Sequence, residues 1–170
     1  MANSSASAQA AAGSDDKVVR CLVVGETADG KSSLLDALLD DTYYSEFPDE
    51  RPKKLDMGSS DAKGVTHEIT SYRGMKLPGT DKHLELYDTP GVGTEQCPIE
   101  EIMASIRTKF EKNIKFQCIL TTAPATTTTP GAGGRIVKLL LNEGLCGDEV
   151  EAWNHVILVG TKADRADKFD

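Results

Sequence analysis

The stretch VVRCLVVGETADGKSSLLDALLD, residues Val18 to Asp40, places a polar, glycine-containing loop between two apolar segments. The first segment, VVRCLVV, is a mainly apolar run with four β-branched valines, which is typical of a strand buried on both faces of a parallel sheet. The second segment has the periodicity of a helix, and one face of it carries Leu34, Leu35, Leu38 and Leu39. This stretch therefore predicts a strand, a loop and a helix, with the residues that can bind a ligand in the loop.

The polar loop GETADGKS, residues 25–32, fits the pattern GxxxxGK[ST]. Its glycines allow successive backbone N–H groups to turn inward and form an anion-binding nest at the positive end of the helix. Lys31 can then reach the β- and γ-phosphates of a nucleotide, and the Ser32 hydroxyl can coordinate Mg²⁺. The predicted phosphate-binding residues are Gly25, Glu26, Thr27, Ala28, Asp29, Gly30, Lys31, Ser32 and Ser33.

Composition limits the classes of protein to which this chain can belong. Its 170 residues, 39% hydrophobic and 27% charged, suit one soluble globular domain with a real core. With 19 basic and 27 acidic residues the net charge is -8 and no basic cluster is present, so we expect no nucleic-acid partner. No apolar run approaches the roughly 20 residues of a membrane-spanning helix. Membrane association is expected only through partners or through regions outside this sequence.

The four cysteines are scattered: they form no CxxC pair, and no histidine lies at zinc-ligand spacing from a pair of them. They are Cys21, Cys97, Cys118 and Cys146. We expect reduced thiols with structural roles, which indicates a cytoplasmic protein, with a place at a membrane periphery left open. Residues 1–16 are rich in alanine and serine but lack the apolar stretch of a signal peptide. A disordered tail is expected over 1–16 and a single domain over 17–170.

Apolar segments alternate with helical ones along the rest of the chain. The expected strands span residues 67–74, 82–88, 116–123 and 155–160, and the expected helices span 99–113 and 134–144. The first two strands flank the turn residues LPGT and predict a hairpin. The first helix has one apolar stripe, formed by Ile99, Ile102, Met103, Ile106 and Phe110. Gly144 should end the second helix as its C′ residue. This alternation predicts an α/β fold with ligands at the carboxyl ends of parallel strands.

Two further polar loops directly follow predicted strands. The loop DTPG begins with Asp88, whose carboxylate can support a Mg²⁺ ion, and Gly91 can donate its N–H to a γ-phosphate. The loop TKAD ends with Asp164, whose carboxylate can accept two hydrogen bonds from the guanine edge. Lys162 can lay its aliphatic stem over the base. Adenine does not offer these two hydrogen-bond donors, so it would leave the carboxylate unpaired and would be rejected.

In this order, GETADGKS, DTPG and TKAD resemble the first, third and fourth motifs of the TRAFAC-class P-loop GTPases, and GVTHEI, residues 64–69, resembles the second. The resemblance implies a three-layer P-loop NTPase fold, whose mainly parallel sheet has one antiparallel strand. It also implies a guanine-nucleotide-binding switch that hydrolyses GTP to GDP and phosphate with Mg²⁺ as cofactor. Thr66, 22 residues before Asp88, takes the place of the family's switch threonine.

The resemblance assigns roles to residues of all four motifs. It implies that the metal is held by Ser32, Thr66 and Asp88, that the γ-phosphate is sensed by Thr66 and Gly91, and that guanine is read by Thr161, Lys162 and Asp164. EAWNHVILVGTKAD, residues 151–164, is similar to the septin-like branch, which includes the immunity-associated GTPases and the chloroplast outer-envelope import receptors. The expected partners are GTP and GDP, with a second copy or a regulatory protein across the nucleotide face.

Two alternatives to a GTP-hydrolysing switch remain open. One is a septin-like assembly module in which GTP binding controls oligomerisation with little turnover. The other is a P-loop ATPase or kinase.

The chain departs from the family pattern in two motif positions. Thr161 stands where the family has asparagine. This difference is expected to weaken the contact between the TKAD loop and the loop GETADGKS, residues 25–32, which we call the phosphate loop. Val92 follows DTPG, where a glutamine orients the attacking water in fast GTPases. Hydrolysis by the chain alone is therefore expected to be slow, and no catalytic residue is assigned. Glu95, Gln96 and Arg73 are the nearest polar candidates in sequence.

The sequence also stops six residues after Asp164, before the strand and helix that the family places last. An incomplete G domain is expected, with an exposed apolar sheet edge. Two long polar loops, residues 41–65 and 121–135, have open roles.

Overall fold

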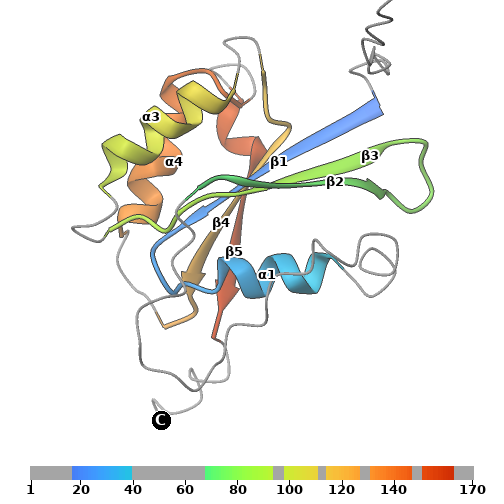
Figure 1. The fold of residues 1–170 in the computed structure, drawn as a ribbon. Helices are drawn as coiled ribbons and strands as arrows, with labels where there is room; N and C mark the ends of the chain where they lie inside the picture. Colours follow the sequence, from blue (N-terminus) through green and yellow to red (C-terminus); the bar gives the residue numbers. More distant parts are fainter. Residues whose placement is uncertain are drawn as a thin grey trace, which may run out of the picture.

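The computed structural model describes residues 17–39, 68–93, 98–110, 114–126, 131–146 and 151–162. These residues form a five-stranded sheet in the order β2-β3-β1-β4-β5 (Figure 1). The strands are β1 Val18–Gly25, β2 Thr70–Lys76, β3 His83–Asp88, β4 Cys118–Pro124 and β5 Val156–Thr161. Only the β2–β3 pair is antiparallel among the described strands. The predicted α/β fold, a mainly parallel sheet with one antiparallel strand, is confirmed.

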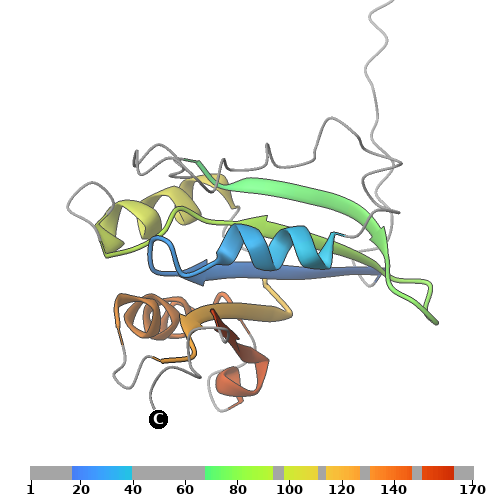
Figure 2. The same cartoon turned by 90° about the horizontal axis from the view of Figure 1, so that it is seen from below.

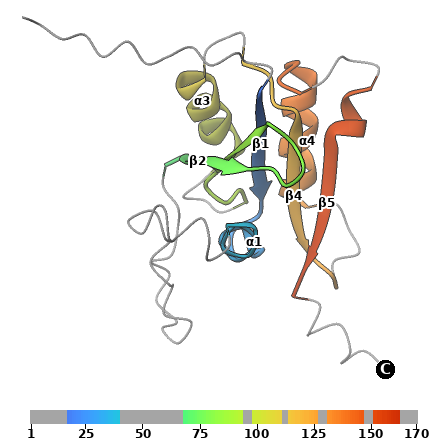
Figure 3. The same ribbon diagram turned by 90° about the vertical axis from the view of Figure 1, so that its right-hand side faces the viewer.

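Helices cover both faces of the sheet. The helices are α1 Lys31–Leu38, α3 Ile99–Lys109 and α4 Ala132–Asn142, and a short 3-10 helix, η3 Ala152–His155, precedes β5. Figure 2 shows α1 lying along β1 and β3, and Figure 3 shows α3 and α4 side by side and apart from α1. The described part of the chain therefore has three layers.

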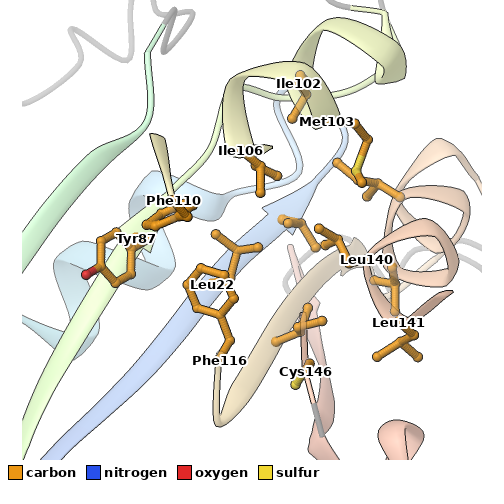
Figure 4. Packing of buried hydrophobic residues seen from close by; sticks show 14 of the residues in the cluster. Leu22, Tyr87, Ile102, Met103, Ile106, Phe110, Phe116, Leu140, Leu141 and Cys146 are labelled. Carbon is orange, nitrogen blue, oxygen red and sulfur yellow. The ribbon is translucent and has the colours of Figure 1, made fainter. Parts of the chain in front are cut away.

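The larger of two apolar clusters lies between the sheet and the α3–α4 layer (Figure 4). Three aromatic rings of this cluster, Tyr87, Phe110 and Phe116, meet edge to face with centroid separations of 4.9, 5.0 and 5.7 Å. Such pairs contribute about 1 kcal/mol each beyond the area they bury. Because Tyr87 is locked here, the carboxyl end of β3 and the residue after Tyr87, Asp88, are held in place.

The smaller cluster lies under α1. The apolar stripe of this helix is narrower than the predicted set of four leucines. Leu35 and Leu39 are each 1% exposed and pack with Val23 and Leu86. Leu38, however, is 38% exposed, and Leu34 is only partly buried. Residues four apart lie directly above one another on a helix, so a short helix over two strands buries one row of leucines rather than two adjacent rows.

The element boundaries shift by a few residues from the predicted ones. Helix α4 begins at Ala132, so residues 121–124 and 132–135 of the predicted loop belong to β4 and α4. Gly144 is the C′ residue as predicted: it has φ 67° and donates to the Leu141 carbonyl, while Leu145 donates to the Leu140 carbonyl. Strand β2 begins at Thr70, three residues after the predicted start.

Three large apolar side chains are exposed around β5, at the edge of the described sheet. Trp153 is 62%, Ile157 52% and Leu158 69% exposed. None of the helices that the structure describes is long and apolar enough to cross a membrane. The predicted tail, residues 1–16, and the predicted loop, residues 41–65, lie outside the described residues.

Candidate functional site

The three motif loops emerge at one edge of the sheet because their strands are parallel and in register. Gly25 at the end of β1 pairs with Thr122 of β4, and Val23 of β1 pairs with Asp88 at the end of β3. Thr161 at the end of β5 pairs with Pro124 of β4. The loops that follow β1, β3 and β5 therefore all start at the carboxyl ends of the parallel strands, with β4 between β1 and β5, as expected for ligand-binding loops of a parallel sheet.

The loop after β1 curls back on itself before α1 begins. Ala28 and Gly30 have φ values of 67° and 86°, and the N–H of Asp29 donates to the Glu26 carbonyl at 3.2 Å. Gly30 is the N-cap of α1. As glycine has no side chain to cap the first turn, it leaves those N–H groups to a ligand, and the helix dipole makes this end attractive to an anion.

The ammonium group of Lys31 lies across this loop. The lysine is only 7% exposed, and its Nζ donates to the carbonyls of Glu26 at 2.7 Å and Gly25 at 3.3 Å. Both acceptors are neutral carbonyl oxygens, and the Asp29 carboxyl of the same loop also interacts electrostatically with this ammonium. A buried cation beside the uncapped N-terminus of a helix is an arrangement suited to a polyphosphate.

The segment after β3 is joined to the phosphate loop by backbone hydrogen bonds. The N–H of Val92 donates to the Gly25 carbonyl, and the N–H of Thr27 donates to the Val92 carbonyl, both at 3.1 Å. The Thr27 hydroxyl also donates to the Gly91 carbonyl at 3.2 Å. Further back, the fully buried Thr89 hydroxyl donates to the Val23 carbonyl at 2.8 Å. These bonds hold DTPG beside the phosphate loop.

Oxygen donors at the same edge suit a small hard cation. Asp88 is 4% exposed at the end of β3, and Ser32 lies in the first turn of α1. A carboxylate and a hydroxyl are the ligand types that Mg²⁺ accepts together with substrate phosphates. The described residues contain no group of three or more His, Cys, Asp or Glu that could hold a metal by themselves. This donor set therefore fits a cation shared with a phosphate ligand.

Thr161 links the loop after β5 to the phosphate loop. Its hydroxyl donates to the Asp29 carbonyl at 2.7 Å, and the Ala123 carbonyl lies 3.2 Å away. A Cβ on Gly30 would lie 3.3 Å from the Thr161 side chain, so the two loops are in close contact. The tie that the sequence predicted to be weak is thus made by a threonine hydroxyl. The next residue, Lys162, has φ 54°.

Two predicted site residues lie outside the described residues, namely Thr66 and Asp164. The structure brings the other predicted phosphate, metal and base residues to the same sheet edge, with Gly25–Ser33, Asp88, Gly91 and the Thr161–Lys162 pair on adjacent loops.

Comparison with known proteins agrees with this arrangement. Residues 20–131 match the model of the family described as 50S ribosome-binding GTPase. The chain belongs to this GTPase family. A search of curated protein sequences gives no significant match.

Solved structures share the fold of this GTPase. Toc33 from Arabidopsis thaliana, as a dimerization-deficient mutant, has a TM-score of 0.58 and 18% identity over 88% of this chain and 52% of its own. Toc33 in complex with Mg²⁺ and GMPPNP has a TM-score of 0.54 and 16% identity over 86% of this chain and 51% of its own. The GTPase spans about half the length of these structures. Its finer assignment to the septin-like branch stays a prediction.

Val92 is a core residue. It is 1% exposed and belongs to the larger apolar cluster, while its backbone bridges to Glu26. A side chain buried in this way serves packing rather than water orientation.

Arg73, one of the nearest polar candidates, is not brought to the site. It lies in β2 with its guanidinium 3.9 Å from Glu85, whereas the site-facing end of β2 pairs Thr70 with Asp88. Three residues of strand correspond to about 10 Å. The other two candidates, Glu95 and Gln96, lie outside the described residues.

The Glu26 carboxylate has a role that sequence reasoning missed. It accepts a hydrogen bond from the N–H of Ala132, the first residue of α4. A carboxylate at a helix N-terminus is stabilised by the helix dipole, so the Glu26 side chain ties the phosphate loop to the start of α4. The sequence signal for this contact was the glycines before the predicted second helix, because glycine lets another side chain approach the backbone closely.

Asp29 is the second acidic residue in the phosphate loop. Burial raises the pKa of its carboxyl, and the hydrogen bond that its Oδ2 accepts from the Glu26 N–H opposes this shift.

Replacing Thr161 with valine tests the link between the loops. Valine has the same shape but cannot donate to the Asp29 carbonyl, so we expect GDP affinity to fall about fivefold to tenfold, or about 1 kcal/mol. Isothermal titration calorimetry measures the affinity. Serine at this position keeps the hydroxyl and should bind GDP almost as the wild type does. Equal affinity of the valine and serine variants would contradict a role for this hydrogen bond.

Proposed function

We propose that this chain binds GTP and GDP, hydrolyses GTP to GDP and phosphate with Mg²⁺, and acts as a nucleotide-dependent switch. The observation that carries the proposal is the junction of three motif loops at one sheet edge. The phosphate loop is bonded to the segment after β3 through Val92 and to the loop after β5 through Thr161. Membership of a GTPase family supports the same reading.

In this proposal each loop holds one part of the nucleotide. The phosphate loop, residues 25–32, binds the phosphates through the N–H groups at the start of α1 and the Lys31 ammonium, and the Gly91 N–H senses the γ-phosphate. Ser32 and Asp88 hold the metal, with Thr66 closing on it. When bound, Mg²⁺ neutralises charge on the phosphate oxygens. Thr161, Lys162 and Asp164 read the base. Because Val92 is buried, the chain alone would turn over slowly, and a partner can supply a catalytic group.

Titration with GDP and with ADP tests the base preference. If Asp164 accepts hydrogen bonds from guanine, GDP should bind at least about 100-fold more tightly than ADP, because ADP leaves a carboxylate without its partners. Calorimetry of the chain, or of any longer parent protein, measures both affinities. Tighter binding of ADP would overturn the guanine assignment and favour the P-loop ATPase or kinase.

Oligomeric state in the two nucleotide states distinguishes a switch from an assembly module. A study of the chloroplast translocon components atToc33 and psToc159 describes dimerization as important for their GTPase activity. For this chain we expect a dimer with a non-hydrolysable GTP analogue and a monomer with GDP, measured by size-exclusion chromatography with light scattering. Oligomers of equal size in both states would instead support the septin-like assembly module.

A further inference from the structure

Two thiols lie next to each other across strands β1 and β4, on the α1 side of the sheet. Cys21 and Cys118 are in-register partners of a parallel strand pair, so their side chains leave the sheet on the same face. Both are free thiols and both pack in the smaller apolar cluster. Neighbouring strands lie about 4.8 Å apart, within the range of Cα separations that a disulfide spans.

The two thiols differ in exposure and in acidity. Cys21 is 7% exposed, whereas Cys118 is partly exposed. A hydrogen bond from the Cys21 thiol lowers the pKa of Cys118, while that contact and burial both raise the pKa of Cys21. Because the thiolate is the reactive form, Cys118 is the residue that a reagent should attack first.

Cys146 offers a contrast with this pair. It is fully buried and packs in the larger cluster, on the opposite face of the sheet from Cys21. Burial raises the pKa of Cys146 to about 11, so this group stays a thiol at neutral pH. The pair on β1 and β4 therefore combines two neighbouring thiols, of which Cys118 is the more accessible and the more acidic.

We propose that Cys118 and Cys21 form an oxidisable pair that a hydroperoxide converts into a cross-strand disulfide. The Cys118 thiolate attacks the peroxide O–O bond, forms a sulfenic acid and releases the other oxygen, which becomes water after protonation. The Cys21 thiol then displaces the sulfenic oxygen as a second water and forms the S–S bond. In total two thiols and one hydrogen peroxide give one disulfide and two waters.

Peptide mapping after peroxide treatment tests the proposal on the whole chain. The folded protein is exposed to hydrogen peroxide, remaining thiols are alkylated, and a non-reducing digest is analysed by mass spectrometry. The expected result is a peptide linking Cys21 to Cys118, lighter than its two parts by two hydrogen atoms and lost on treatment with dithiothreitol. Without peroxide, limited N-ethylmaleimide should label Cys118 before Cys21.

Matched variants separate this pair from other routes of oxidation. Cys21→Ser should leave a sulfenic acid at Cys118 that dimedone traps, and Cys146→Ser should still form the linked peptide. A wild-type map with both residues unlinked, or with Cys118 linked to Cys146 or Cys97, would overturn the proposal. The wild-type map decides the question even where a variant folds poorly.

Discussion

Replacement of Lys31 with alanine is expected to lower the affinity for GDP by at least about 100-fold, because two or more charge-assisted hydrogen bonds to phosphate are lost. In the structure the Lys31 ammonium is buried across the phosphate loop and bonded to the carbonyls of Gly25 and Glu26. A buried cation in that position has much to gain from an anionic ligand. Isothermal titration calorimetry with GDP measures the loss.

Lys138 provides the matched control for this experiment. It is an exposed lysine on α4, so Lys138→Ala removes the same charge away from the phosphate loop. Its GDP affinity should stay within about twofold of the wild type, because exposed charges contribute little. A Lys31→Ala variant that melts normally and still binds GDP within tenfold of wild type would count against the entire phosphate site.

The Gly91→Ala substitution is expected to have the second-largest effect, this time on stability. A Cβ at Gly91 would lie 2.6 Å from Thr27 Cα and 2.8 Å from its backbone nitrogen. Backbone atoms cannot rotate out of the way, so the hydrogen bonds between this segment and the phosphate loop would have to break. We expect the free energy of unfolding to fall by about 3 kcal/mol, as in other overpacked sites, measured by urea denaturation.

Gly133 tests whether this cost comes from the contact rather than from glycine replacement in general. It is also buried against the phosphate loop, but a Cβ there would lie 3.5 Å from Gly25 Cα, an ordinary contact. Gly133 lies within α4, where alanine favours the helix by up to about 1 kcal/mol. Gly133→Ala should therefore be neutral or stabilising. Equal destabilisation by both substitutions would contradict the close approach at Gly91.

Local sequence patterns were enough to predict most of the fold. The valine-rich run before Gly25 predicted a strand buried on both faces, and the last five residues of β1 are buried. Apolar spacing in the helix that begins at Ile99 predicted the side that the structure buries. Both signals arise from neighbours along one element, where the period of the backbone decides which side chains share a face. The stripe of α1 was predicted too wide because sequence does not show how much of a helix the sheet beneath it covers.

The phosphate loop was determined by the sequence itself, because eight consecutive residues supply its glycines, its lysine and its serine. Only the tertiary structure decided how the loops are joined. The Thr161 hydroxyl donates to the Asp29 carbonyl, 132 residues away in the sequence. The Glu26 carboxylate accepts from the N–H of Ala132, 106 residues away, and the Thr27 hydroxyl donates to the carbonyl of Gly91, 64 residues away. Such bonds depend on strand order and register, which bring distant loops to one edge, and no local period in the chain encodes them.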